Sequence, residues 1–128
     1  MDFQIIQTDR APAAIGPYSQ GIIANGFLFT AGQIALDPKS GEIIGDDIQT
    51  QTRQALTNLQ AVVQAADISL ENVVKMTLFL SDMNDFSAMN QVYEQFFTQH
   101  KPARSAVEVS RLPKDALVEV EAVAVLEK

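Results

Sequence analysis

The 128-residue chain contains no cysteine, no tryptophan and a single histidine, His100. Without cysteine there can be no disulfide framework, no thiolate nucleophile and no thiolate metal site. A zinc site also lacks its usual ligands, because only one imidazole is available. The sequence has no glycine-rich phosphate loop. Binding of Mg²⁺ or Ca²⁺ by carboxylates alone stays open, although no calcium-loop motif occurs.

Basic residues are few. Nine lysines and arginines stand against 16 aspartates and glutamates, which gives a formal net charge of -7. This charge argues against a nucleic-acid binder and against docking on an anionic membrane. No apolar run approaches the roughly 20 residues needed to cross a bilayer, and the N-terminus lacks the pattern of a signal peptide. We therefore expect a soluble, cytoplasmic protein with neither nucleic acid nor membrane as a partner.

The length fits one domain, residues 1–128, and a hydrophobic content of 47% is enough for a real core. Asn25-Gly26 is a strong two-residue hairpin signal, because both residues tolerate positive φ. Alternating and helical patterns predict the other elements in chain order. These are strands at 3–7, 19–24 and 27–31, a helix from Asp46 or Asp47 to about Ala66, a strand at 73–81, a helix at about 85–99, and strands at 102–109 and 118–125.

This order, β-β-β-α-β-α-β-β, predicts an α+β fold with two helices on one sheet. Each helix has a single apolar stripe, which suits packing on one face of that sheet. The other face would then carry Phe79, Val123 and Val125 in water, which a small domain rarely tolerates. We therefore expect self-association in a closed symmetric oligomer to cover this face.

The last predicted strand carries two carboxylates, Glu119 and Glu121, which point to the same face because they are two residues apart. The strand is otherwise apolar on both faces, so we expect both faces to be covered. Burying an unpaired carboxylate is costly, so each needs a partner or water. Arg104, near the start of the preceding strand, is the obvious candidate. We therefore look to these two strands for a site that binds a small anion.

Several stretches match the pattern of a known family: residues 11–18 (APAAIGPY), 30–34 (TAGQI), 84–86 (NDF), Asn90, 93–97 (YEQFF) and 102–124. On these residues the chain resembles the RidA-type reactive intermediate deaminases, also called 2-iminobutanoate/2-iminopropanoate deaminases, nearly from end to end. The resemblance implies a chorismate-mutase-like α+β fold with one mixed sheet, and a homotrimer with three active sites in clefts between subunits.

The activity implied by the resemblance is hydrolysis of enamine and imine intermediates that pyridoxal-phosphate enzymes release, which protects those enzymes from damage. 2-Aminoacrylate would give pyruvate and ammonia, and 2-aminocrotonate would give 2-oxobutanoate and ammonia. The ligand is then a small 2-imino or 2-oxo acid. No cofactor and no metal is implied.

The resemblance places the family's substrate-carboxylate arginine on Arg104 and its water-positioning glutamate on Glu119. A guanidinium can hold a carboxylate through two parallel hydrogen bonds. A carboxylate can orient and partly deprotonate the water that attacks an imine carbon. Two alternatives stay open. Arg104 could form an ion pair with Glu119 or Glu121 and bind no ligand, and Glu121, otherwise a structural charge partner, could take the role of Glu119.

Four further residues are candidates for substrate binding. Tyr18 could close the pocket with its phenol, or be an ordinary half-buried tyrosine. Gly32 matches a glycine whose backbone contacts the ligand, or marks a bulge or turn where another group approaches the backbone closely. Asn90 could reach the cleft from the second helix, or lie on the helix surface. Ala106 stands where many bacterial relatives have a cysteine, which excludes thiol chemistry but leaves a water mechanism intact.

Other functions also stay open. A non-catalytic trimer that binds small carboxylates or a regulatory protein would have the same fold, and it would need Arg104 but not Glu119. Ribonuclease activity, attributed to some relatives, is disfavoured by the charge of -7. We expect His100 to cap the second helix at its C-terminus rather than act as a base, and Phe86 to belong to the core.

Overall fold

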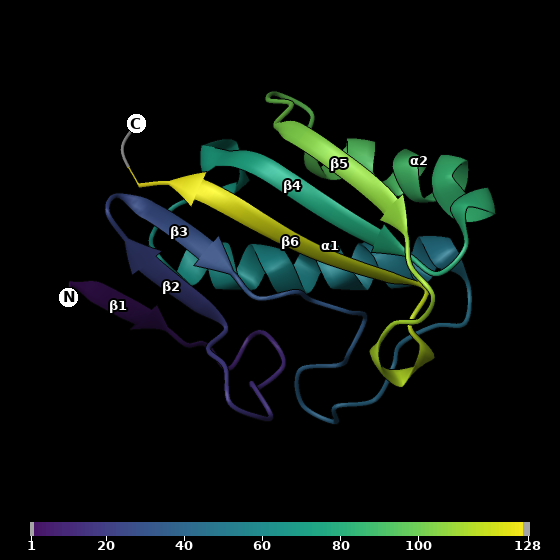
Figure 1. Cartoon of the computed structure of the whole chain (residues 1–128), viewed down its shortest axis with the longest axis horizontal. Coiled ribbons are helices and arrows are strands. Elements are labelled where there is room, and N and C mark those ends of the chain that lie inside the picture. The colour runs from purple at the N-terminus through teal and green to yellow at the C-terminus, as the bar shows by residue number, and fades with distance from the viewer. Residues whose placement is uncertain (1, 127–128) are drawn as a thin grey trace.

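The computed structural model describes residues 2–126 as one six-stranded sheet with two α-helices packed on one of its faces (Figure 1). The order of helices and strands is the predicted one. The elements are β1 (Phe3–Ile6), β2 (Gly21–Ala24), β3 (Phe27–Thr30), α1 (Ile48–Ala65), β4 (Val73–Leu80), α2 (Phe86–Phe96), β5 (Ala103–Glu108) and β6 (Val118–Val125), with short 3₁₀ turns at Leu70–Asn72, Met83–Asp85 and Pro113–Asp115.

The strands lie in the order β1-β2-β3-β6-β4-β5. All neighbours are antiparallel except β4 and β5, which are parallel. The sheet is therefore mixed, and the predicted α+β class is confirmed. The two C-terminal strands, which the sequence analysis treated as close neighbours, are separated by β4. The connection at 109–117 carries the chain from one edge of β4 to the other.

Local sequence accounts for most of the boundaries. Asn25 and Gly26 have φ angles of 54° and 83°, as a tight two-residue hairpin requires. The carboxylate of Asp47, one of the two predicted caps, accepts a hydrogen bond from the N–H of Thr50 and begins α1. Most strands are slightly shorter than predicted, because the turn residues at their ends leave the sheet early.

The second helix begins where predicted, at Phe86 after the 3₁₀ turn at Met83–Asp85, but it ends at Phe96 rather than near residue 99. His100 therefore does not cap the helix. Its Nε2 lies 2.6 Å from the carbonyl oxygen of Val73, at the start of β4. The prediction was wrong because the chain leaves the helix after Phe96 and returns to the sheet, where the imidazole of His100 contacts the backbone of β4.

The main hydrophobic core fills the space between the helices and one face of the sheet. Successive residues of a strand point to opposite faces, so Met76, Leu78 and Leu80 of β4 all point under the helices and are fully buried. Burying a side chain of this size stabilises the fold by about 1.5–3 kcal/mol. The helical side adds Ala55, Leu56, Leu59, Val62 and Val63 of α1, Met89 and Tyr93 of α2, and Phe97 just after it.

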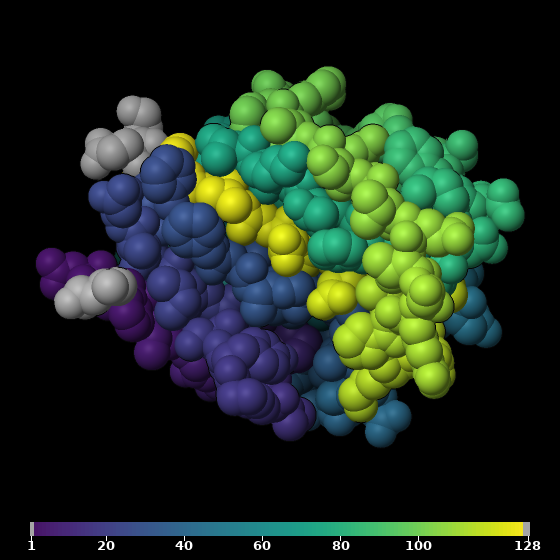
Figure 2. All heavy atoms as spheres, in the orientation of Figure 1, coloured from purple at the N-terminus to yellow at the C-terminus, as the bar shows by residue number. Residues whose placement is uncertain are grey.

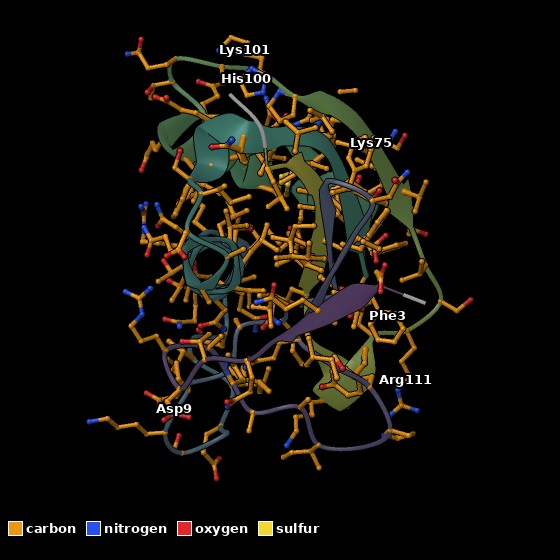
Figure 3. The ribbon with its side chains drawn as sticks, turned by 90° about the vertical axis from the view of Figure 1, so that its left-hand side faces the viewer. Phe3, Asp9, Lys75, His100, Lys101 and Arg111 are labelled. Carbon is orange, nitrogen blue, oxygen red and sulfur yellow. The ribbon has the colours of Figure 1, made fainter. Side chains whose placement is uncertain are left out.

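The opposite face of the sheet has no helix over it in the part of the chain that the structure describes (Figures 1 and 2). Several large apolar side chains are exposed there: Phe3 (54%), Ile5 (60%), Phe29 (46%) and Val107 (43%). In the side view, Phe3 and Lys75 project from the side of the sheet that faces away from α1 (Figure 3). We call this surface the uncovered face.

The residues predicted for the uncovered face, Phe79, Val123 and Val125, do lie on it, and each is half-buried. Exposed apolar side chains that gather on one face of a sheet mark an interaction site, so self-association remains the cover that we expect for this face. Neither helix within residues 2–126 combines the length and the apolar character that a membrane span needs.

Candidate active site

Arg104 and Glu119, the two residues central to the predicted site, lie on opposite faces of the sheet. In β5, Arg104 stands opposite Met76, which is fully buried under the helices. In β6, Glu119 stands opposite Phe79, on the uncovered face. Strand alternation thus sends the two side chains to different sides, and β4 separates their strands. The expectation that Arg104 pairs with Glu119 or Glu121 within the chain was therefore wrong.

Arg104 lies beside α2 at a cavity of about 740 Å³, which we call the arginine cavity. Its Nη1 donates a hydrogen bond of 2.6 Å to Oδ1 of Asn90. Its guanidinium carbon lies 4.7 Å from the ring centre of Tyr93 and 5.4 Å from that of Phe86, distances at which a cation and a ring attract each other. Asn90 thus lies against the arginine, and Phe86 contacts the arginine as well as the core.

No carboxylate neutralises Arg104 within residues 2–126, where the only ion pair joins Arg111 and Asp115. A half-buried guanidinium at a cavity can bind an anion such as a carboxylate. Ala106 lies on the same face of β5, opposite Leu78, and its methyl group packs against the core. The arginine cavity is lined by Asn90, Tyr93, Glu94, Phe97, Thr98, Lys101, Pro102 and Arg104.

Glu119 borders a second cavity of about 450 Å³, the glutamate cavity. The loop that carries Tyr18 forms one wall, and Tyr18 is 53% exposed, so its phenol is accessible to a ligand. Tyr18, Gly32 and Glu119 come together here, whereas Arg104 and Ala106 of β5 lie on the helix side of the sheet with Asn90 of α2. The other lining residues are Pro12, Ala13, Ile15, Gln33, Ile34, Leu36, Pro113 and Lys114.

The side chain of Glu119 lies directly on the backbone of Gly32. A Cβ atom at position 32 would come within 2.7 Å of Glu119 Cδ and would overlap a carboxylate oxygen. The next residue, Gln33, exchanges backbone hydrogen bonds of 2.8 and 3.0 Å with Val120, which fixes this part of the chain against β6. The group that approaches Gly32 closely is therefore the candidate base itself.

Burial raises the pKa of the Glu119 carboxyl above its ordinary value, and the negative charge of Glu121 on the same face adds to the rise. A carboxylate with a raised pKa is a better general base near neutral pH. Glu121 forms no ion pair within residues 2–126, so its expected role as a structural charge partner is not found. Glu119 rather than Glu121 lines the cavity.

Three buried carboxamides hold the chain around the glutamate cavity, and the sequence analysis missed them. Gln20 binds backbone groups of residues 8–12. Asn58 donates to two carbonyl groups of segment 34–36, and Gln51 accepts from the backbone just before β6. All three are almost fully buried. Gln51 and Asn58 lie on the apolar stripe of α1. A polar side chain on such a stripe is usually hydrogen-bonded, so their positions in the sequence could have identified them.

We predict that Gly32→Ala displaces the Glu119 carboxylate without unfolding the protein, because the clashing atoms end a flexible side chain that can turn away. The thermal midpoint should stay within about 3 °C of wild type. In the matched control Gly21→Ala, the new Cβ meets core atoms of Leu28 and Val62 at 3.2 Å. That variant should melt about 5 °C lower or more, with Glu119 in place.

Crystal structures and melting curves of both glycine variants test this prediction. A Glu119 carboxylate that stays over position 32 in Gly32→Ala would contradict it, as would a loss of stability in that variant equal to the loss in Gly21→Ala.

Comparison with known proteins identifies the family. The sequence model described as Endoribonuclease L-PSP matches residues 8–126. A RutC family protein of Synechocystis sp. is 60% identical over 98% of both chains. The 2-iminobutanoate/2-iminopropanoate deaminase of Escherichia coli is 50% identical over 94% of this chain and 95% of its own. The crystal structure of E. coli TdcF with bound serine superimposes with a TM-score of 0.92 at 50% identity, covering 97% of this chain and 99% of that one. The chain therefore belongs to this family, the Rid family of RidA-type proteins, as the sequence resemblance predicted.

Proposed function

We propose that this protein hydrolyses reactive 2-imino acids and their enamine forms to 2-oxo acids and ammonia. One observation carries the proposal: the two cavities hold complementary groups. Arg104, which has no carboxylate partner within residues 2–126, lies at the arginine cavity, and Glu119, whose pKa is raised, lies at the glutamate cavity. The names of two E. coli relatives, each 50% identical, support it: one is a 2-iminobutanoate/2-iminopropanoate deaminase and the other a putative reactive intermediate deaminase.

The substrates are small and carry one fixed charge, the carboxylate. 2-Aminoacrylate gives pyruvate, and 2-aminocrotonate gives 2-oxobutanoate. Arg104 holds the carboxylate, because Nη1 is engaged by Asn90 and its other N–H groups remain available for two parallel hydrogen bonds.

Removal of these intermediates protects the pyridoxal-phosphate enzymes that release them. A cytoplasmic location, expected from the sequence, stays a prediction.

Glu119 acts as the general base toward the attacking water. The substrate reacts as its protonated, iminium form. The carboxylate takes a proton from water as the new C–O bond forms at the iminium carbon, and the C=N electron pair moves to nitrogen, which becomes a neutral amine. The protonated carboxyl then returns this proton to the amine. The C–N bond breaks and ammonia leaves as the C=O bond forms, and the hydroxyl proton passes to the Glu119 carboxylate and from there to ammonia. Free imines hydrolyse unaided in water, so a carboxylate clamp and one positioned base are sufficient for this chemistry.

Each site lies between two subunits in this proposal. Arg104 and Glu119 of one chain face opposite sides of the sheet, so one small ligand must take them from different copies. The arginine cavity of one subunit then meets the glutamate cavity of the next. The uncovered face, with Phe29 and Val107 exposed, supplies the apolar surface for assembly. Three copies around one axis, which the family resemblance implies, give three such sites.

The remaining candidates have supporting roles in the composite site. The exposed phenol of Tyr18 donates a hydrogen bond to the ligand or to the water from the glutamate side. Gly32 leaves room for the Glu119 carboxylate and brings a backbone group close to the ligand. Ala106 contributes a small wall beside Arg104 and no thiol, so it leaves the reaction type unchanged.

The alternative function is a trimer that binds small carboxylates without turnover. The E. coli TdcF structure holds a bound serine, and serine carries a carboxylate. Binding of a carboxylate does not by itself require Glu119, whereas hydrolysis does. The name of the family model refers to ribonuclease activity. The net charge of -7 disfavours RNA as the substrate here, and we propose no nucleic-acid partner.

An imine-trapping assay tests the deaminase. Threonine dehydratase or an amino-acid oxidase generates the imine in place, and semicarbazide competes for it. We expect the wild-type protein to suppress semicarbazone formation and Arg104→Ala to lose this effect. Glu119→Gln should lower turnover by about 10²- to 10⁴-fold while it still binds 2-oxobutanoate.

Arg111→Ala is the matched control for the arginine variant, because Arg111 is exposed and pairs only with Asp115. It should behave as wild type. A wild-type protein without effect on imines from several amino-acid precursors would reject the deaminase and favour the carboxylate-binding alternative.

We also predict that the protein is a trimer at micromolar concentration and that Phe29→Asp weakens the assembly. Phe29 is 46% exposed in the middle of the uncovered face, so a carboxylate there would be buried without a partner. Thr57→Asp, on the exposed side of α1, is the control and should leave the trimer intact. Sedimentation equilibrium measures the mass. A monomeric wild-type protein would contradict both the trimer and the inter-subunit site.

A further inference from the structure

The guanidinium of Arg104 is held entirely by neutral groups of α2. Asn90 accepts the hydrogen bond from Nη1, and the ring faces of Tyr93 and Phe86 lie 4.7 and 5.4 Å from the guanidinium carbon. A carboxylate in any of these places would hold the arginine more strongly, but it would also neutralise the charge that the substrate needs. Neutral partners fix the orientation and leave the charge available.

Tyr93 is the most firmly fixed of these partners. It is 7% exposed, it belongs to the main core, and its ring packs on Phe97 with the centroids 4.8 Å apart. Its hydroxyl is buried and has no hydrogen-bond partner within residues 2–126. The ring face, 4.7 Å from the guanidinium carbon, is therefore the part of Tyr93 that we assign to holding the arginine, although the hydroxyl also lies close to Arg104. A cation over an aromatic face is attracted to it, and more strongly when the pair is shielded from water.

The charge state of Tyr93 suits this role. Burial raises the pKa of the phenol above its ordinary value, and the positive charge of Arg104 opposes part of that rise. The phenol is thus neutral at physiological pH. A phenolate at this distance would compete with the substrate carboxylate for the guanidinium.

Taking the proposed deaminase as the basis, we propose that Tyr93 is a positioning residue for substrate recognition. Its ring face, assisted by Phe86, holds the Arg104 guanidinium in a fixed orientation without neutralising it. Tyr93 acts through Arg104 on binding of the substrate carboxylate and takes no part in proton transfer. Its removal should therefore affect KM and leave kcat nearly unchanged.

The test compares three variants in the imine-trapping assay and in calorimetric binding of 2-oxobutanoate. Tyr93→Leu removes the ring, and we expect KM and the Kd for 2-oxobutanoate to rise about fivefold to tenfold with kcat within about twofold of wild type. Tyr93→Phe keeps the ring and should match wild type in all three. Leu28→Ala removes a fully buried core side chain of β3 that lines neither cavity, so it should melt lower but keep wild-type affinity.

Several results would overturn the proposal. Tyr93→Leu could keep wild-type affinity, Tyr93→Phe could lose as much as Tyr93→Leu, or Leu28→Ala could weaken binding equally. If Tyr93→Leu does not fold, Phe86→Leu tests the same point from the less buried ring. It should raise KM and Kd in the same direction, and unchanged values would reject the proposal.

The design separates this proposal from the deaminase. A wild-type protein that binds 2-oxobutanoate but does not hydrolyse imines would reject the proposed function, and the binding data on the variants would still decide the role of Tyr93. A wild-type protein that hydrolyses imines, with a Tyr93→Leu variant of unchanged KM, would reject only the role of Tyr93. A wild-type protein that neither binds 2-oxobutanoate nor hydrolyses imines would reject both.

Discussion

The alternation of side chains along β4 and its two neighbours is the constraint on which the site depends. β4 pairs with β5 on one edge and β6 on the other, and its residues Met76, Leu78 and Leu80 fill the core. In this register Arg104 shares the helix side with Met76, and Glu119 shares the uncovered side with Phe79. A shift by one residue in either strand would turn the core outward, so the separation of the two functional groups is fixed by the same packing that stabilises the fold.

Each half of the site has its own rigid support. The arginine side relies on α2, whose Asn90, Tyr93 and Phe86 hold the guanidinium with neutral contacts. The glutamate side relies on buried carboxamides such as Gln20 and Asn58, which tie irregular segments to regular elements. Buried amides of this kind are costly to leave unpaired. Their full pairing makes these segments well-defined walls, although they have no regular secondary structure.

The sequence predicted the elements and the family, but it did not predict the strand order, which sends Arg104 and Glu119 to opposite faces of the sheet. The hairpin at Asn25-Gly26 and the cap at Asp47 are local signals, and both predictions were confirmed. The place of β6 between β3 and β4 follows from long-range pairing, which no local pattern encodes, so the pairing of Arg104 with Glu119 was misjudged. His100 was misplaced for a similar reason, because its partner Val73 is distant in sequence.

The central claim is that every site takes its arginine and its glutamate from different subunits, and subunit mixing tests it most directly. Arg104→Ala and Glu119→Gln are each expected to be inactive alone. Unfolded together in equal amounts and refolded, they should regain about a quarter of wild-type turnover, since random assortment around a closed ring of three restores one intact site in each mixed trimer. A mixture that remains as inactive as its two components would contradict the account.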